Sequence, residues 1–365
     1  MRLASAEIDL TALRENLQLT QKLAPKSKIM AVLKANAYGH GLVKIAQHLQ
    51  DADAFAVARV DEALALRTGG ITKPIVLLEG FFHPSDLPIL LANNLQTIVH
   101  DISQLEAIER ANLDAPLTVW LKVDTGMHRL GVEPEEFEAF YARLKRSKNV
   151  ADKIHLMTHF ACADDIKDNK TEVQQVLFKS LVGQSHAPLC LANSAGIIGW
   201  PESHGDWIRP GLMLYGVSPM LARVGQQHGL KPVMRLTTKV IAIKRVRAHQ
   251  AVGYGGRWQC EQDTYLAVIG VGYGDGYPRH AKIGTPVVIG NQRYGIVGTV
   301  SMDMISVNIG DNSNGIQVGD EVEMWGPNLP VEEIAQCADT IPYELLCNVT
   351  PRVSYEYIEG QTLSA

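Results

Sequence analysis

A lysine that ends an apolar run is the first residue whose setting suggests chemistry. In the segment IMAVLKANAYGHG, residues 29–41, apolar side chains lead directly to Lys34, and Tyr38, two glycines and His40 follow it. An amine that is partly removed from water has a lowered pKa, so it is a better nucleophile toward the carbonyl carbon of an aldehyde. The plainer interpretation is that this lysine only extends its charge to solvent.

Polar residues end other apolar runs as well. His159 and the pair Asn193-Ser194 each close such a run, Arg209 lies in another, and Arg129 follows a further one in DTGMHRLG. An Asn-Ser pair at the start of a short helix can present a hydroxyl and backbone N–H groups to an anion, although it is more often only a cap. A lysine together with a phosphate site indicates pyridoxal phosphate or an aldolase that acts on phosphorylated sugars.

Eight short apolar segments alternate with helical patterns in the first part of the chain, and they predict strands. They lie at 28–34, 53–58, 74–79, 95–99, 117–123, 154–160, 187–193 and 207–215. This alternation predicts a (β/α)8 barrel of the TIM type, in which the C-terminal ends of the strands meet at one mouth. The candidate residues would converge there. The alternative, an open doubly wound sheet, usually carries G-x-G-x-x-G after its first strand, and this chain has no such motif.

The pattern changes near residue 225. Short β-branched segments joined by glycines follow, with Gly290-Asn291 as a plausible hairpin turn and a single helix near VEEIAQCAD. We therefore expect a barrel domain over residues 1–225 and a mostly β domain over residues 226–365.

Charge and cysteine usage exclude several classes of protein. The 365 residues carry a net charge of −5 without the basic run that binds nucleic acid or a membrane surface. The segment MRLASAEIDL lacks the apolar core of a secretory signal. Five dispersed cysteines without a C-x-x-C pair indicate reduced thiols and a cytoplasmic protein. H-E-x-x-H is absent and DNSNG is better interpreted as a turn than as a calcium loop, so we expect no metal.

A set of motifs, taken together, resembles the bacterial alanine racemases. They occur in the family's order, cover nearly the whole chain, and are AVLKANAYGHG, LKVDTGMHRLG, THFACADD, ANSAGI, RPGLMLYG, VGYGG, GYGDGYPR and SMDM. The resemblance implies a pyridoxal-phosphate enzyme with a barrel and a C-terminal β domain. It also implies a head-to-tail homodimer in which each β domain contributes residues to the partner's active site.

The resemblance implies a role for each matching residue. Lys34 would hold the cofactor as an aldimine, and Lys122 matches a position that is carbamylated in several members. The cofactor would be surrounded by Tyr38, His159, Asn193, Ser194, Arg209, Gly211, Leu212 and Tyr343. Arg129 and Met302 would contact the substrate, and the access channel would include Asp164, Tyr273 and Arg279.

The implied reaction interconverts L-alanine and D-alanine through two opposed bases. Lys34 would serve the D-alanine proton and Tyr254, from the partner subunit, the L-alanine proton. A phenol with an ordinary pKa of about 10 needs nearby positive charge for this task. Arg209 at the ring nitrogen argues against a barrel-type decarboxylase, whose equivalent residue is acidic, and the β domain argues against a non-catalytic cofactor carrier. The same motifs suit an enzyme that supplies D-alanine for peptidoglycan or one that degrades it.

Overall fold

The chain folds into two compact units, which the computed structural model describes over residues 3–183 and 185–359. The barrel unit contains residues 14–214 and 219–222. The β unit contains, in its described part, residues 3–13, 215–218 and 223–359. The first described residues therefore belong to the same unit as the last described ones.

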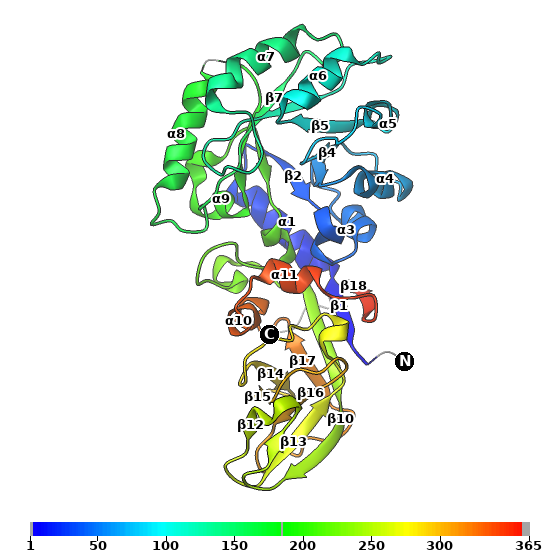
Figure 1. The fold of residues 1–365 in the computed structure, drawn as a ribbon, viewed down its shortest axis with the longest axis vertical. Helices are drawn as coiled ribbons and strands as arrows, with labels where there is room; N and C mark the ends of the chain where they lie inside the picture. Colours follow the sequence, from blue (N-terminus) through cyan, green and yellow to red (C-terminus); the bar gives the residue numbers. More distant parts are fainter. Residues whose placement is uncertain (1–2, 184, 360–365) are drawn as a thin grey trace. The chain divides into compact units, whose positions relative to one another are not determined.

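Eight parallel strands close the barrel in sequence order, and β2 pairs with β9 to complete the ring (Figure 1). They are β2 (Lys28–Val32), β3 (Ala54–Val57), β4 (Ile75–Leu77), β5 (Leu95–Val99), β6 (Val119–Lys122), β7 (His155–Met157), β8 (Leu189–Asn193) and β9 (Trp207–Arg209). Each of the eight predicted strands is present, and the predicted (β/α)8 class is confirmed. The strands are mostly apolar because both of their faces are buried.

Six of the eight predicted strands end earlier than expected, and the reason is visible for the last and the first of the eight. The last one stops at Arg209 because Pro210 has no N–H to donate, and the chain then turns into a 3-10 helix, η3 (Leu212–Tyr215). The first one stops at Val32, and the residues from Ala35 to Tyr38 form a turn of unusual hand that is described below.

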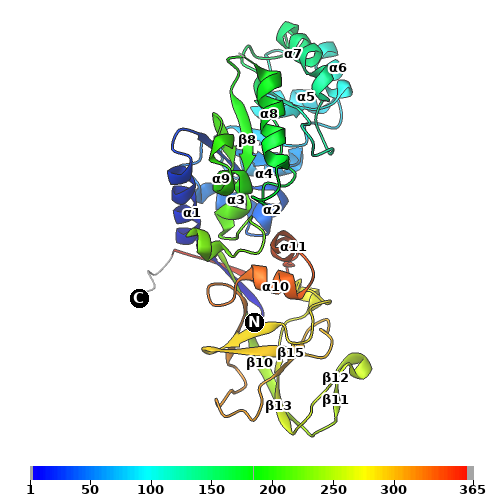
Figure 2. The ribbon, with the colours of Figure 1, turned by 90° about the vertical axis from the view of Figure 1, so that its left-hand side faces the viewer.

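Helices follow most of the barrel strands and lie outside them (Figure 2). On α3, Leu42, Ile45 and Ala46 form one apolar stripe, and all three are buried, as the spacing of these residues in the sequence predicts. The helices are α1 (Leu10–Leu23), α3 (Leu42–His48), α4 (Val60–Thr68), α5 (Asp86–Ala92), α6 (Ile102–Arg110), η1 (Pro134–Glu136), α7 (Phe137–Arg146), α8 (Lys170–Val182), α9 (Ser194–Gly199) and η2 (Pro201–Ser203).

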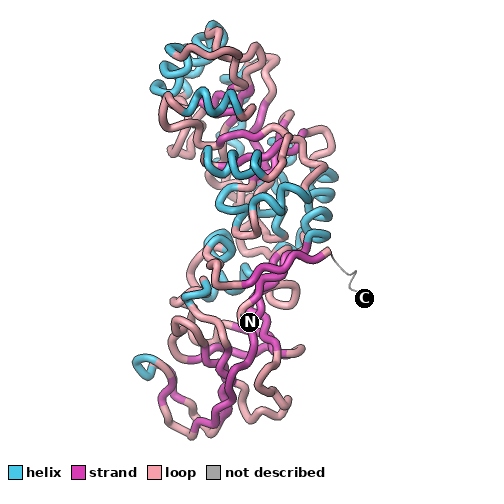
Figure 3. Tube along the Cα trace, turned by 90° about the vertical axis from the view of Figure 1, so that its right-hand side faces the viewer, coloured by secondary structure: helices cyan, strands magenta, loops and turns pink. Residues whose placement is uncertain are grey.

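The β unit is built on one sheet, in which six strands form a closed ring. Its strands are drawn in magenta in Figure 3. The long strand β10 closes the ring because it pairs with β17 through Leu236–Lys239 and with β13 through Val240–Val246. The ring consists of β10 (Met234–Val246), β13 (Thr264–Ile269), β14 (Pro286–Ile289), β15 (Gln292–Val297), β16 (Ile305–Asn308) and β17 (Glu321–Trp325). The predicted hairpin joins β14 to β15, and Gly290 has the positive φ of 60° that such a two-residue turn requires.

Two further strands extend this sheet from the ends of the chain. β1 (Ser5–Asp9) pairs antiparallel with β10 and parallel with β18 (Ser354–Ile358). The remaining elements of the unit are η4 (Gly225–His228), β11 (Ala251–Val252), η5 (Tyr254–Gly256), β12 (Trp258–Gln259), η6 (Tyr273–Asp275), α10 (Val331–Cys337) and α11 (Pro342–Cys347). Within the described ranges, no helix has the length and apolar character to cross a bilayer, and no cluster of three metal-ligating side chains occurs.

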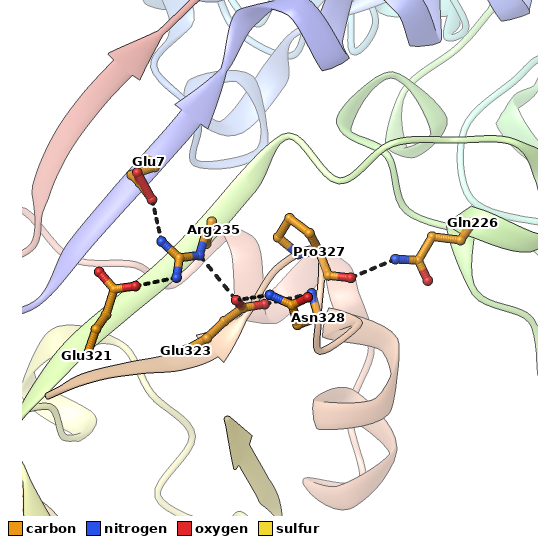
Figure 4. A network of polar contacts seen from close by, with 7 residues as sticks. All are labelled: Glu7, Gln226, Arg235, Glu321, Glu323, Pro327 and Asn328. Atoms are coloured by element: carbon orange, nitrogen blue, oxygen red, sulfur yellow. Dashed lines mark hydrogen bonds and ion pairs between the residues drawn. The ribbon is translucent and has the colours of Figure 1, made fainter. Parts of the chain in front are cut away.

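An ion-pair network ties three strands of the β unit together (Figure 4). Arg235 of β10 donates to Glu7 of β1 at 2.8 Å, to Glu323 of β17 at 3.1 Å, and to Glu321. The Glu323 side chain is only 2% exposed and also accepts from the backbone and side-chain N–H groups of Asn328. The arginine thus balances a buried carboxylate that would otherwise be costly.

Replacing Arg235 with alanine should destabilise the protein by roughly 3 kcal/mol, because it leaves the charge of Glu323 buried with only Asn328 as a partner. The exposed Glu321 supplies the control variant Glu321→Ala, whose loss should stay within about 1 kcal/mol. Chemical denaturation of both variants measures the difference. Equal losses would show that the buried carboxylate does not depend on the arginine.

Candidate active site

Charged and polar side chains gather at the C-terminal ends of the barrel strands. Lys122, Asn193 and Arg209 are the last residues of β6, β8 and β9, while Lys34 and His159 follow the ends of β2 and β7. The strands are parallel in one closed barrel, so these ends meet at one mouth. The structure therefore brings together the barrel residues singled out from the sequence.

Arg209 is held in place by backbone oxygens. Its side chain is buried, and its two terminal nitrogens donate to the carbonyl oxygens of Thr158 at 2.7 Å, Cys190 at 3.0 Å and Leu191 at 3.2 Å. The Cys190 Sγ accepts a further contact at 3.0 Å. Five partners around a planar, permanently charged group fix both its position and its plane.

His159 completes that set and is uncharged. Burial, followed by the charges of Arg209, Lys122, Arg129 and Lys34, holds its pKa well below the ordinary value of 6.5. The Arg209 Nη2 lies 3.2 Å from His159 Nδ1, and a guanidinium can only donate. The Nδ1 atom therefore accepts, and Nε2 carries the proton of the neutral ring.

Lys122 lies in the same cationic group. Burial, assisted by the positive charges of Arg209, Arg129 and Lys34, lowers its pKa to about 8, while Asp124 acts in the opposite sense. Such a concentration of positive charge favours an anionic ligand. A larger share of Lys122 is also present as the free amine than for an ordinary lysine.

The loop that carries Arg129 is organised around Asp124. One carboxylate oxygen, Oδ1, accepts the backbone N–H groups of Gly126, Met127 and His128 at 2.8 to 3.1 Å. Burial alone would raise the pKa of Asp124, but these donors lower it, so the group stays anionic. The exposed Arg129 follows directly on this closed loop.

Ser194, Gly211 and Tyr38 form a cradle at the ends of β8, β9 and β2. The Ser194 Oγ accepts the N–H of Gly211 at 2.8 Å and of Met213 at 3.4 Å, which leaves the hydroxyl proton as a donor. A Cβ atom at Gly211 would lie 2.5 Å from Tyr38 Oη, so only glycine lets the phenol approach this closely. This donor set, with the nearby cations, suits a phosphate group. Leu212 is buried beside it, and Asn193 caps α9 by accepting the N–H of Gly196.

The segment after Lys34, labelled α2 (Lys34–Tyr38), is a left-handed turn. Ala35, Asn36, Ala37 and Tyr38 all have φ of 53° or 54°. Each L-residue in this conformation costs roughly 1–2 kcal/mol, so the surroundings must stabilise the turn. His40 contributes, because its Nδ1 donates to the carbonyl oxygens of Tyr38 at 2.8 Å and Ala37 at 3.1 Å.

The remaining predicted residues lie in a loop of the barrel unit and in the β unit. Asp164 is in the barrel unit, in the loop after β7, where its carbonyl oxygen accepts the N–H of Leu221. In the β unit, the Arg279 guanidinium lies 6.0 Å from the centre of the Tyr273 ring. The N–H of Tyr273 donates to Ser301 O at 3.1 Å, next to Met302.

Three predicted residues of the β unit face solvent in the single chain. Tyr254 in η5 is 69% exposed, and Tyr343 in the first turn of α11 is 37% exposed. Met302 is 51% exposed as well. The roles that the sequence assigns to these side chains therefore stay predictions for an assembled site.

Sequence reasoning missed residues that hold the site from behind. Gln174 donates to Thr125 Oγ1 at 3.2 Å and to His159 O at 3.0 Å, and it accepts the N–H of Ala161. Thr158, Cys190 and Glu62 are further examples. No motif marks them, although Glu62 stands at the third position of α4, where an acidic residue often caps a helix.

The fold and the site define a (β/α)8-barrel enzyme that holds a lysine among cations suited to a phosphorylated ligand. Residues 8–219 match the family model for the N-terminal domain of alanine racemase, and residues 233–357 match that for the C-terminal domain. The chain belongs to the alanine racemase family.

Known alanine racemases are similar to this chain over nearly its full length. The chain is 52% identical over 358 residues to an alanine racemase of Yersinia pestis, covering 98% of this chain and 99% of that protein. The same identity holds over 357 residues, with the same coverage, for an alanine racemase of Vibrio cholerae. The crystal structure of the biosynthetic alanine racemase from Pseudomonas aeruginosa superposes with a TM-score of 0.95 at 42% identity, covering 98% of this chain and all of that one.

The strain in the left-handed turn predicts a stabilising substitution. Ala35 is exposed and has φ of 53°, so Ala35→Gly should raise the free energy of unfolding by about 1 kcal/mol. The control is Ala142→Gly at an exposed position of α7, which should lower it by about 0.5–1 kcal/mol. Denaturant titration distinguishes the two signs, and a loss in both variants would show that the turn stores no strain.

The buried ring of His40 predicts acid sensitivity. Burial lowers the pKa of His40 from 6.5 to about 4. Below pH 6.5 this imidazole therefore becomes protonated in the unfolded chain while it stays largely neutral in the folded one. Between pH 7 and pH 5 this residue alone should reduce the free energy of unfolding by about 2 kcal/mol. His40→Asn keeps a neutral donor and should remove that part of the pH dependence in urea titrations at the two pH values.

The exposed His83 supplies the control variant His83→Asn. If the His40 and His83 variants lose stability with acid as steeply as the wild type does, the buried imidazole is not the group responsible.

Proposed function

We propose that this chain interconverts L-alanine and D-alanine with pyridoxal phosphate as its cofactor, and that two chains share each active site. The observation that carries this is the convergence of Lys34, Lys122, His159 and Arg209 at the strand ends, beside the Ser194–Gly211–Tyr38 cradle. The cationic group suits a doubly charged phosphate and a carboxylate together.

The residues present fit the cofactor. When bound, pyridoxal phosphate supplies an aldehyde that bonds to amines and a conjugated ring that accepts the electron pair left by a departing Cα proton. Lys34 would bond to it, and the Ser194 hydroxyl, the Tyr38 phenol and the backbone near Gly211 and Leu212 would hold its phosphate. Asn193 and Tyr343 complete the predicted set.

Arg209 would face the ring nitrogen and decide which reaction follows. Its guanidinium is permanently charged and is already fixed by three carbonyl oxygens, so it donates a hydrogen bond and cannot transfer a proton. A carboxylic acid at the same place would protonate the nitrogen and strengthen electron withdrawal. The arginine therefore favours racemisation over decarboxylation and transamination, and this argues against the decarboxylase alternative.

Two side chains on opposite faces of the substrate would move the protons. Lys34, once its amine is released, would exchange a proton with Cα on the D-alanine face, and Tyr254 from the partner subunit would do so on the L-alanine face. One proton leaves and one arrives, so the product differs from the substrate only in hand. His159 and Arg129 supply polar and positive groups that favour a phenol oxygen as proton acceptor.

The remaining residues would select and admit the substrate. Arg129 binds the carboxylate, and Met302 of the partner subunit restricts the side chain to little more than a methyl group. Asp164, Tyr273 and Arg279 line the access channel. A free Lys122 amine can add carbon dioxide and release a proton, and the resulting carbamate would orient Arg129.

The exposed positions of Tyr254 and Met302 in the β unit support the proposed assembly, because neither can act on a substrate while it faces solvent. A homodimer with exchanged β-unit loops would bury both. We also place the enzyme in the cytoplasm, on the basis of its dispersed cysteines. Its D-alanine would serve peptidoglycan synthesis, or its reaction would open the degradation of D-alanine.

Complementation between two inactive variants tests the shared site. Lys34→Ala and Tyr254→Phe homodimers should each lose nearly all racemisation, measured as the decay of the circular dichroism of L-alanine. A mixed dimer, isolated with two different affinity tags, contains one site with both bases intact. It should recover about half of the wild-type rate, since one site of two is restored.

If both residues act within one chain, every site of the mixed dimer keeps a defect, and the mixed dimer stays as inactive as its parents. The visible absorption of the bound cofactor in the Tyr254→Phe dimer provides the control for correct folding. Wild-type protein without any effect on L-alanine would contradict the assigned activity itself.

A further inference from the structure

The left-handed turn after Lys34 is held at its first peptide by a side chain from a different part of the barrel. The N–H of Ala35 donates to Glu62 Oε1 at 2.7 Å. The other oxygen, Oε2, accepts the N–H of Ala58 at 2.9 Å and of Arg59 at 3.2 Å. One carboxylate thus links the residue after Lys34 to the corner between β3 and α4.

This contact acts on the orientation of Lys34 through a planar group. The Ala35 N–H belongs to the peptide unit that joins Lys34 to Ala35, and a peptide unit is planar. Fixing the direction of that N–H therefore fixes the ψ angle of Lys34. The ψ angle in turn fixes how the Lys34 side chain leaves the backbone relative to the turn that follows.

The turn needs such an external acceptor. Ala35 and Ala37 have no side-chain group that could select a left-handed conformation, and L-residues disfavour it. Its far end is held by His40 and by Asn36, whose Oδ1 accepts the N–H of Leu42 at 2.9 Å. Glu62 provides a side-chain contact at the near end, which is the end next to Lys34.

We propose that Glu62 is a positioning residue for Lys34, and that the hydrogen bonds accepted by its two carboxylate oxygens place the lysine amine for proton exchange with D-alanine. The inference rests on the proposed role of Lys34. A carboxylate is required because both of its oxygens accept hydrogen bonds. A glutamine keeps one accepting oxygen, and its NH2 group can only donate. The hydrogen bonds accepted by one of the two carboxylate oxygens are therefore lost.

A test follows the two proton exchanges separately in the loaded enzyme. In D2O, mass spectrometry measures the initial rate at which D-alanine and L-alanine each exchange their Cα hydrogen. Glu62→Gln should slow exchange from D-alanine by about tenfold or more, because a misplaced reacting group loses its alignment, and should slow exchange from L-alanine much less. A general loosening of the protein would slow both exchanges equally, and that result would overturn the proposal.

The neighbouring Asp61 provides a matched control. It is exposed in the same first turn of α4, so Asp61→Asn removes the same charge at nearly the same place. We expect Asp61→Asn to exchange both enantiomers as the wild type does. A selective loss of D-alanine exchange in this variant would assign the effect to charge near the helix end and would contradict a specific contact by Glu62.

A second variant separates the turn from the cap that Glu62 gives to α4. Ala35→Gly removes the steric preference against the left-handed conformation, so the double variant Glu62→Gln/Ala35→Gly should regain part of the D-alanine exchange. If the selective loss in Glu62→Gln persists unchanged in the double variant, the carboxylate acts by some route other than the turn, and the proposal fails.

Failure of the proposed function would look different. Borohydride reduction of the loaded wild-type enzyme, followed by peptide mapping, should place the cofactor on Lys34. A label on another residue, or no exchange from either alanine in the wild type, would contradict the assigned active site. Labelling at Lys34 with equal behaviour of Glu62→Gln and wild type would contradict the role of Glu62 alone.

Discussion

The guanidinium of Arg209 and the three carbonyl oxygens around it form the contact on which the site depends. A buried positive charge is stable only when oxygens surround it, and here β8 and the residue after β7 provide them. The rest of the electrostatics follows from this fixed charge. It sets the tautomer of His159, it adds to burial in lowering the pKa of Lys122, and it makes the mouth of the barrel attractive to anions.

The second constraint concerns shape. After β2 the chain forms a left-handed turn, which is unfavourable for every residue in it. Side chains on both sides hold this turn, because they accept hydrogen bonds from its N–H groups or donate to its carbonyl oxygens. Rigid barrel strands stabilise such a conformation, since they fix the distance between the groups that form hydrogen bonds to the turn. Strain and positive charge therefore meet at the same strand ends, where the reacting groups are proposed to act.

The sequence predicted the barrel because a strand buried on both faces is continuously apolar, and eight such runs separated by helices have few alternative folds. It did not predict the turn after Lys34, since Ala-Asn-Ala-Tyr carries no glycine and looks like an ordinary helix start. Contacts such as those of Glu62 and Gln174 join residues distant in sequence, and no local pattern encodes them. The roles proposed for Tyr254, Met302 and Tyr343 came from resemblance rather than from periodicity, because the site proposed for them requires an assembly.

The pairing of β1 with β10 and β18 has a consequence for synthesis on the ribosome. β1 emerges first, but β10 begins only at residue 234 and β18 at residue 354. At 5–20 residues per second, roughly 10 to 45 seconds separate the first strand from its earliest partner. The barrel unit can close during that interval, whereas β1 must wait as an unpaired strand, and the charges of Glu7 and Asp9 help to keep it from aggregating.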